Sequence, residues 1–192
     1  MSYEYDVFFS YKRDPESIFW HRRVRDLLRH WLTQSLGGSK ARIFMDEDAI
    51  DTGDRWKAEL INGLQRSKCL VPVWSPEYFH SKWCLSEWKA FRDRESLLQI
   101  ERGGLIVPIK YCDGEHFPKE AGEIQMYDFS IYTCTLPAFW ETPRAVQLER
   151  EIRSFAEQLA EKVKRAPAFA PDWPAEEVMN VPGPPKISLA KL

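Results

Sequence analysis

The segment of residues 75–91, SPEYFHSKWCLSEWKAF, carries an indole and a carboxylate, Trp83 and Glu87, one helical turn apart. Ser81 is a suitable N-cap for a helix that starts there, so both side chains lie on one flank of its first turns. The apolar run at residues 69–74 predicts a strand just before this helix. The flank is therefore expected over the carboxyl edge of a sheet, where open α/β sheets bind their ligands.

Taken alone, these residues are also compatible with a purely structural role. Glu87 is most simply a solvated helix residue, and Trp83 fits core packing as well as ligand binding. Other catalytic classes lack their motifs, because the chain has no P-loop, no GxGxxG turn after its first strand and no GxSxG nucleophile elbow. A phospho-receiver domain would need an aspartate at the end of the third strand, where this chain has Ser75. No metal site is expected, since the histidines at positions 21, 30, 80 and 116 lack metal-ligand spacing.

Apolar segments with strand character alternate with helical patterns along the chain. The strands are expected at residues 3–10, 41–45, 69–74, 105–111 and 124–129. The helices are expected to begin at Asp14, Asp54, Ser81 and Thr142. This alternation predicts an α/β fold with a doubly wound parallel sheet and right-handed crossovers. Pro72 and Pro108 fall inside two of the expected strands, where each removes one backbone donor.

Length and composition indicate one globular domain followed by a tail. A chain of 192 residues can bury a core without disulfides or metals. The domain is expected over residues 1–166, and the proline-rich residues 167–192 are expected to form a disordered or extended tail. The formal net charge is −2 and the charges are interspersed, so binding to nucleic acid or to a membrane surface is not expected.

The sequence also bears on the compartment. It shows no signal peptide and no run of about 18 apolar residues, so we expect no membrane span. The four cysteines are widely spaced and form no CxxC pair, which is typical of reduced thiols rather than of a disulfide framework. We therefore expect a cytoplasmic protein.

Four segments, in order and in register, together resemble a Toll/interleukin-1 receptor (TIR) domain, in particular the bacterial-type, NAD-cleaving members. They are YDVFFSYKR at residues 5–13, FMDEDAIDTGDRW at 44–56, SPEYFHSKWCLSEW at 75–88 and VPIKY at 107–111. The resemblance covers roughly the first 165 residues and leaves the tail outside it. It implies a flavodoxin-like five-stranded sheet of strand order 2-1-3-4-5, and either NAD cleavage or the scaffolding of signalling complexes.

The resemblance also implies a role for Glu87, because the NAD-cleaving members have their catalytic glutamate at the fifth position of a WCxxE segment. The nicotinamide of NAD is a pyridinium that departs neutral, so no general acid is needed, unlike in ordinary glycoside hydrolysis. One ionised glutamate can stabilise the oxocarbenium-like charge or hold the ribose hydroxyls. Trp83 would wall the site or stack on a ring. NAD is then the substrate, and no cofactor is expected.

The family's other contacts map onto two further segments. Residues just after the first strand contact the dinucleotide in the family, which implies substrate binding by Ser10, Tyr11, Lys12 and Arg13. The acidic segment 46–53, which begins at Asp46, corresponds to a mobile loop that gates the site and contacts a neighbouring subunit. The resemblance therefore also implies substrate binding by Asp46.

The resemblance therefore leaves two functions. In the first, the chain is an NAD glycohydrolase in immunity or antiviral defence, activated by self-association with other TIR domains. In the second, it is a non-catalytic module that recruits TIR domains through the 46–53 loop. The product, ADP-ribose or a cyclic or conjugated form, is not determined by the sequence.

Overall fold

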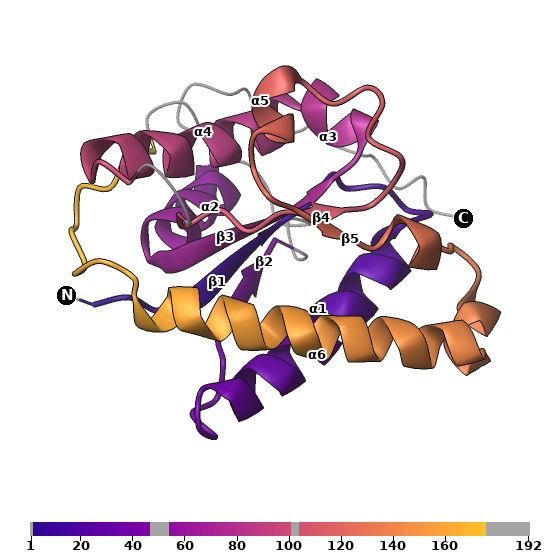
Figure 1. Ribbon diagram of the computed structural model, residues 1–192. Helices are drawn as coiled ribbons and strands as arrows, with labels where there is room; N and C mark the ends of the chain where they lie inside the picture. The colour runs from indigo at the N-terminus through magenta and orange to yellow at the C-terminus, as the bar shows by residue number, and fades with distance from the viewer. Residues whose placement is uncertain (1, 47–53, 101–103, 176–192) are drawn as a thin grey trace.

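A computed structural model describes residues 2–46, 54–100 and 104–175. Within these residues, five strands form one sheet in which every neighbouring pair is parallel and the order is β2-β1-β3-β4-β5 (Figure 1). The strands are β1 (Tyr5–Ser10), β2 (Ile43–Met45), β3 (Ser67–Trp74), β4 (Ile109–Lys110) and β5 (Tyr127–Asp128). The predicted doubly wound parallel sheet with this order is confirmed.

Helices cover both faces of the sheet, as the doubly wound topology requires (Figure 1). On one face lie α1 (Ile18–Ser35) and α6 (Pro143–Lys164). On the other lie α2 (Asp54–Gln65), α3 (Pro76–His80), α4 (Lys82–Leu97) and α5 (Lys119–Gly122). The short 3-10 helices η1 (Ser130–Tyr132) and η2 (Pro137–Glu141) connect β5 to α6.

Successive side chains of the central strands point to opposite faces of the sheet, and this divides the interior into two cores. Val7, Phe9 and Val73 pack in the core beneath α1 and α6, whereas Phe8 and Trp74 pack in the core beneath α2 and α4. All five are almost completely buried. Successive strand side chains point to opposite faces, so a strand that is buried on both sides is apolar throughout.

The two prolines inside the expected strands explain where strand pairing is interrupted. Pro72 lies at the last position where β3 pairs with β1, and β3 pairs with β4 from Val73 onward, so the missing donor falls at the junction of two ladders. The expected strand at residues 105–111 is wrong in extent. It is divided by Pro108 into an isolated bridge at Ile106 and the two-residue β4.

The helix starts differ in two places from the expectation. The carboxylate of Asp14 accepts a hydrogen bond from the Ser17 backbone nitrogen at 2.9 Å, but it stabilises a turn, and α1 begins only at Ile18. The short helix α3 was not predicted, and Ser75 is its N-cap, accepting from the Tyr78 nitrogen at 3.2 Å. The predicted N-cap of α4, Ser81, is confirmed.

Residues 166–175 follow α6 as an arm without helix or strand, which passes back over the domain. Trp173 and Ala175 of this arm are 8% and 2% exposed, and the Gln65 side chain donates to the Trp173 carbonyl at 2.9 Å. The described part of the expected tail therefore packs on the domain. The boundary at residue 166 stays a prediction, and residues 176–192 lie outside the described residues.

Candidate active site

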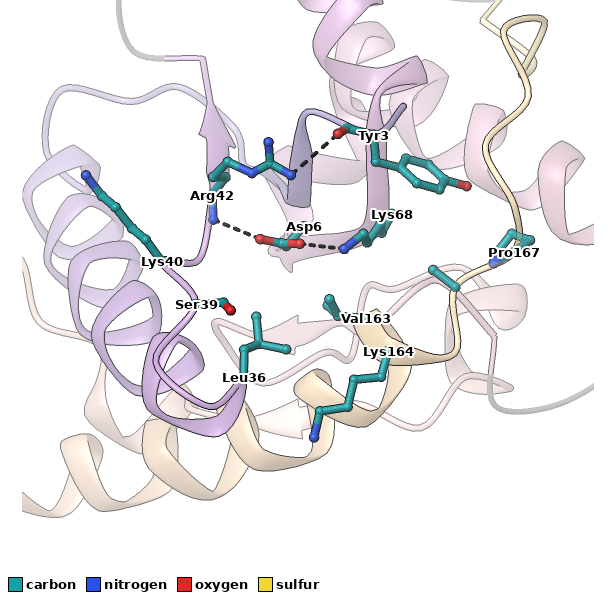
Figure 2. A pocket seen from close by; sticks show the side chains of 11 residues that line it. Tyr3, Asp6, Leu36, Ser39, Lys40, Arg42, Lys68, Val163, Lys164 and Pro167 are labelled. Carbon is teal, nitrogen blue, oxygen red and sulfur yellow. Dashed lines mark hydrogen bonds and ion pairs between the residues drawn. The ribbon is translucent and has the colours of Figure 1, made fainter. Parts of the chain in front are cut away.

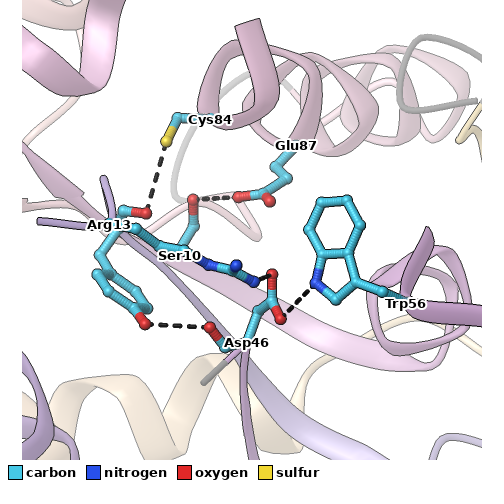
Figure 3. Close-up of polar contacts among 7 residues, drawn as sticks. Ser10, Arg13, Asp46, Trp56, Cys84 and Glu87 are labelled. Atoms are coloured by element: carbon cyan, nitrogen blue, oxygen red, sulfur yellow. Dashed lines mark hydrogen bonds and ion pairs between the residues drawn. The ribbon is translucent and has the colours of Figure 1, made fainter. Parts of the chain in front are cut away.

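Glu87 lies in the second turn of α4 and is only 6% exposed. Helix α4 is positioned there by its N-cap, because the Ser81 hydroxyl accepts a hydrogen bond from the Cys84 nitrogen at 3.4 Å. Glu87 extends from the helix toward the carboxyl end of β1 (Figure 3). The simplest interpretation from sequence, a solvated helix residue, is therefore wrong for Glu87.

A chain of hydroxyl groups holds this carboxyl group. The Ser10 hydroxyl, at the end of β1, donates to Glu87 Oε2 at 2.5 Å (Figure 3). The Tyr78 hydroxyl lies 2.9 Å from Ser10 Oγ and donates to the Cys84 carbonyl at 3.1 Å. Tyr78 has one proton for two possible acceptors, so its hydrogen bonding can adjust when the proton on Glu87 is lost or gained.

The surroundings of Glu87 favour its neutral form. Burial raises the pKa of Glu87 from 4.5 to about 8, the hydrogen bond from Ser10 and the charge of Arg13 lower it, and the charge of Asp46 raises it. Burial dominates because a carboxylate loses its hydration in a low-dielectric site. Glu87 is therefore mostly protonated near neutral pH, and a ligand that carries positive charge would promote its ionisation.

A second group of polar contacts lies beside Glu87 (Figure 3). Arg13 forms an ion pair with Asp46, and its guanidinium lies 5.1 Å from the centre of the Trp56 ring. Trp56 Nε1 donates to Asp46 Oδ1 at 2.7 Å, and the Tyr11 hydroxyl donates to the Asp46 carbonyl at 3.0 Å. Asp46 therefore joins the ends of β1 and β2 to helix α2.

Trp83 completes an aromatic wall with Trp56. The two ring centres are 4.7 Å apart in an edge-to-face arrangement, and the Lys57 ammonium lies 5.8 Å from the Trp83 ring centre. Trp83 is partly buried, so its ring both packs against Trp56 and faces the cavity described next. Such a pair can present an aromatic edge or face to a planar ligand.

These residues enclose a cavity of about 240 Å³ at the carboxyl edge of the sheet. All seven predicted site residues line it, namely Ser10, Tyr11, Lys12, Arg13, Asp46, Trp83 and Glu87. Sequence reasoning missed Trp56 as a lining residue and Tyr78 as a partner of Ser10. Both lie inside segments that the resemblance singled out, and their aromatic side chains next to the loop and to α4 were the available signal.

The cavity combines a buried carboxyl group, two cationic side chains and an aromatic wall. The cationic side chains can hold phosphate groups, and the carboxyl group, once ionised, can stabilise positive charge on a bound ligand. In the described ranges, no group of three or more His, Cys, Asp or Glu side chains could hold a metal ion. None of the helices described is long and apolar enough for a membrane span.

A larger hollow of about 560 Å³ lies at the opposite edge of the sheet, and its charges have structural explanations (Figure 2). Lys68 pairs with Asp6 at 2.8 Å, and the Arg42 backbone nitrogen donates to the same carboxylate at 3.0 Å. Lys164 pairs with Glu161 at 3.0 Å in the last turn of α6, and Lys40 is exposed. The cavity around Glu87 is therefore the stronger candidate for a functional site.

A comparison with family models matches residues 7–136 to the TIR domain. The chain belongs to the TIR-domain family. The matched segment contains every residue that lines the cavity around Glu87. This TIR domain is thus matched to its family through the same part of the chain that forms its candidate active site.

Several relatives contain a similar domain. The disease resistance protein RPV1 of Vitis rotundifolia is 30% identical over 119 residues, which are 62% of this chain and 8% of that protein. The NAD(+) hydrolase TcpA of Theionarchaea archaeon (strain DG-70-1) is 27% identical over 108 residues, which are 56% of this chain and 29% of that protein. The matches thus span less than a third of either relative.

Among solved structures, one similar chain is the TIR domain of the Toll-related receptor TRR-2 from Hydra magnipapillata. It is 26% identical to this TIR domain, the match covers 78% of this chain and 98% of that chain, and the TM-score is 0.43.

Proposed function

We propose that this TIR domain is an NAD glycohydrolase that cleaves the bond between nicotinamide and ribose, with Glu87 as its catalytic residue. The observation that carries the proposal is a buried carboxyl group, 6% exposed, that lines a cavity together with Lys12, Arg13 and Trp83. A relative named as an NAD(+) hydrolase supports it. The products would be nicotinamide and ADP-ribose, or a cyclic or conjugated form of ADP-ribose.

Each group has a role in this proposal. Glu87, once ionised, stabilises the positive charge that develops on the ribose as the nicotinamide leaves. Lys12 and Arg13 bind the pyrophosphate, and the aromatic wall of Trp83 and Trp56 accepts the planar nicotinamide. Ser10 holds the Glu87 carboxyl group in place by its hydrogen bond of 2.5 Å.

The raised pKa of Glu87 would couple its ionisation to substrate binding. A bound pyridinium places positive charge next to the carboxyl group and so lowers the pKa of Glu87 from its value of about 8. The positively charged nicotinamide ring of the substrate thereby favours the ionised form of Glu87 that the reaction needs.

This coupling predicts the pH dependence of nicotinamide release. We expect kcat/KM for NAD to rise by about tenfold per pH unit below a pKa near 8, because kcat/KM reports the free enzyme. The profile of kcat should reach its plateau at a lower pH than the profile of kcat/KM, because the bound cation favours ionised Glu87. Initial rates measured from about pH 6 to pH 9, with circular dichroism at each pH as the folding control, test this. A constant kcat/KM over that range contradicts the assignment.

We further propose that self-association switches the activity on. Asp46, the first residue of the expected gating loop, is held by Arg13, Trp56 and Tyr11, so it connects the cavity to that loop. The loop itself, residues 47–53, lies outside the described residues. A site that is competent for only a fraction of the time binds its substrate more weakly by that fraction, and a neighbouring subunit could remove this loss.

The switch predicts a dependence on protein concentration. We expect nicotinamide release per subunit to rise by about tenfold when the purified protein is concentrated or crowded, if roughly one tenth of free subunits are competent. Light scattering on the same samples reports assembly. Constant activity per subunit across samples whose assembly differs contradicts the switch and leaves the chemistry of Glu87 untouched.

The rival function is a scaffold that recruits other TIR domains. It is favoured by the way the polar groups satisfy one another, since Arg13 is paired with Asp46 and Glu87 is neutral near pH 7. The same concentrated samples decide between the two functions. Assembly without any release of nicotinamide from NAD would favour the scaffold.

A further inference from the structure

A second hollow shares a wall with the candidate active site. It measures about 430 Å³, and Lys12 and Arg13 line both this hollow and the cavity around Glu87. Its other walls come from α1, represented by His21, and from the residues that follow β3 and β4, among them Ser75 and Tyr111. We call it the β1–β3 hollow.

The β1–β3 hollow lies at the point where the chain changes sides of the sheet. After β1 the chain enters α1 on one face, and after the neighbouring β3 it enters α3 and α4 on the other face (Figure 1). The connections therefore diverge at the carboxyl ends of these two strands and leave a crevice. Doubly wound sheets bind nucleotides in this crevice.

The size of the two cavities matters, because the proposed substrate is a dinucleotide. Pockets that hold drug-sized ligands usually measure about 300–1,000 Å³. The cavity around Glu87, about 240 Å³, is smaller than that range and can hold only part of NAD. The β1–β3 hollow adds the missing room directly beyond the Lys12–Arg13 wall.

We propose that the β1–β3 hollow receives the adenosine monophosphate half of NAD while the nicotinamide ribose lies against Glu87. The inference rests on the proposed NAD cleavage. The pyrophosphate then crosses the shared wall, where Lys12 is exposed and has no ion-pair partner among the described residues.

The walls of the β1–β3 hollow suit a purine nucleoside. The rings of His21 and Tyr111 lie 5.3 Å apart, and His21 is 4% exposed with a pKa that burial lowers to about 3. Its Nδ1 has no hydrogen-bond partner in the described part of the chain. A neutral imidazole can donate or accept, as the edge of adenine also does. The exposed carboxylates of Glu16 and Glu77 can accept hydrogen bonds from ribose hydroxyls.

Blocking the hollow without touching Glu87 tests this placement. Thr135 and Glu77 are exposed residues in its lining, so Thr135→Trp and Glu77→Trp each fill it with a bulky ring from a different segment of the chain. Leu136→Trp is the matched control, because Leu136 is adjacent, 66% exposed and absent from the lining of either cavity. Thermal unfolding of each variant verifies the fold.

Two readouts are measured on the full chain, namely calorimetric binding of AMP and the ratio of kcat/KM for NAD to that for nicotinamide mononucleotide. We expect both filled variants to weaken AMP binding and to reduce the ratio by about tenfold or more, and Leu136→Trp to leave both within about twofold. The inference is overturned if the filled variants fold but keep the AMP affinity and the kcat/KM ratio of the parent. It is also overturned if the parent protein binds no AMP at millimolar concentration. A third outcome separates the two proposals. If the parent binds AMP, the filled variants do not, and no NAD cleavage is ever detected, the nucleotide site is supported and only the proposed function is refuted.

Discussion

Replacing Glu87 by glutamine is expected to slow NAD cleavage by about a hundredfold or more while the protein remains folded and assembles as before. Glutamine keeps the shape of the side chain and can still accept the hydrogen bond that Ser10 donates at 2.5 Å. It cannot supply the negative charge that offsets the developing cation on the ribose. The measurement is single-turnover release of nicotinamide at saturating NAD, with assembly followed by light scattering.

The stability of Glu87→Gln separates a catalytic from a structural effect. The pKa of Glu87 is raised from 4.5 to about 8, so between these pH values the native state holds a proton that the unfolded state has lost. Stability therefore falls as the pH rises through this window, and the loss is absent when residue 87 cannot ionise. We expect Glu87→Gln to unfold at a temperature equal to or above that of the parent at pH 7 and pH 8.

The matched control for this variant is Asp93→Asn on the same helix. Asp93 is 42% exposed in its side chain and pairs with Lys89 across one turn. Such a surface pair contributes little, so we expect parent-like cleavage and stability. Cleavage by Glu87→Gln at the parental rate in equally assembled samples would remove Glu87 from the reaction.

The largest expected effect on stability is at Arg94, which is completely buried in α4. Its guanidinium donates to the carbonyl of Ser67 at 2.8 Å and to that of Leu64 at 3.0 Å. It also lies 4.2 Å from the Phe91 ring centre and 4.9 Å from that of Trp173. One side chain therefore joins α2, the start of β3, α4 and the C-terminal arm.

Arg94→Ala is expected to lower the free energy of unfolding by about 3 kcal/mol, because it leaves a cavity and removes the donors of two buried carbonyl groups. For a chain of this size the change corresponds to a decrease in Tm of roughly 6–12 °C. Arg92→Ala is the matched control, since Arg92 is exposed on the same helix and its guanidinium lies 5.2 Å from the centre of the Trp88 ring. Chemical denaturation of both variants gives the two values, and equal losses would contradict a structural role for the burial of Arg94.

Patterns that act over a few residues were predictable from the sequence. The apolar runs through Val7 and Leu70 correctly indicated strands buried on both faces, and the alternation of strands with helices correctly indicated the parallel sheet. Ser81 was correctly predicted as an N-cap, because capping depends on the residue itself and on the next three. The resemblance to the family named seven candidate site residues, and all seven line one cavity, although their roles stay predictions.

Only the tertiary structure determined how buried and how charged those side chains are. Helical periodicity places Glu87 on a flank of α4, but its pKa is raised by burial among residues that the fold brings together and is lowered in part by the hydrogen bond from Ser10, which is distant in sequence. The burial of Arg94 was likewise not predictable, because no local pattern around Arg94 indicates that Trp173 packs against it. Desolvation and long-range hydrogen bonding depend on neighbours that the fold brings together, and local sequence patterns do not contain them.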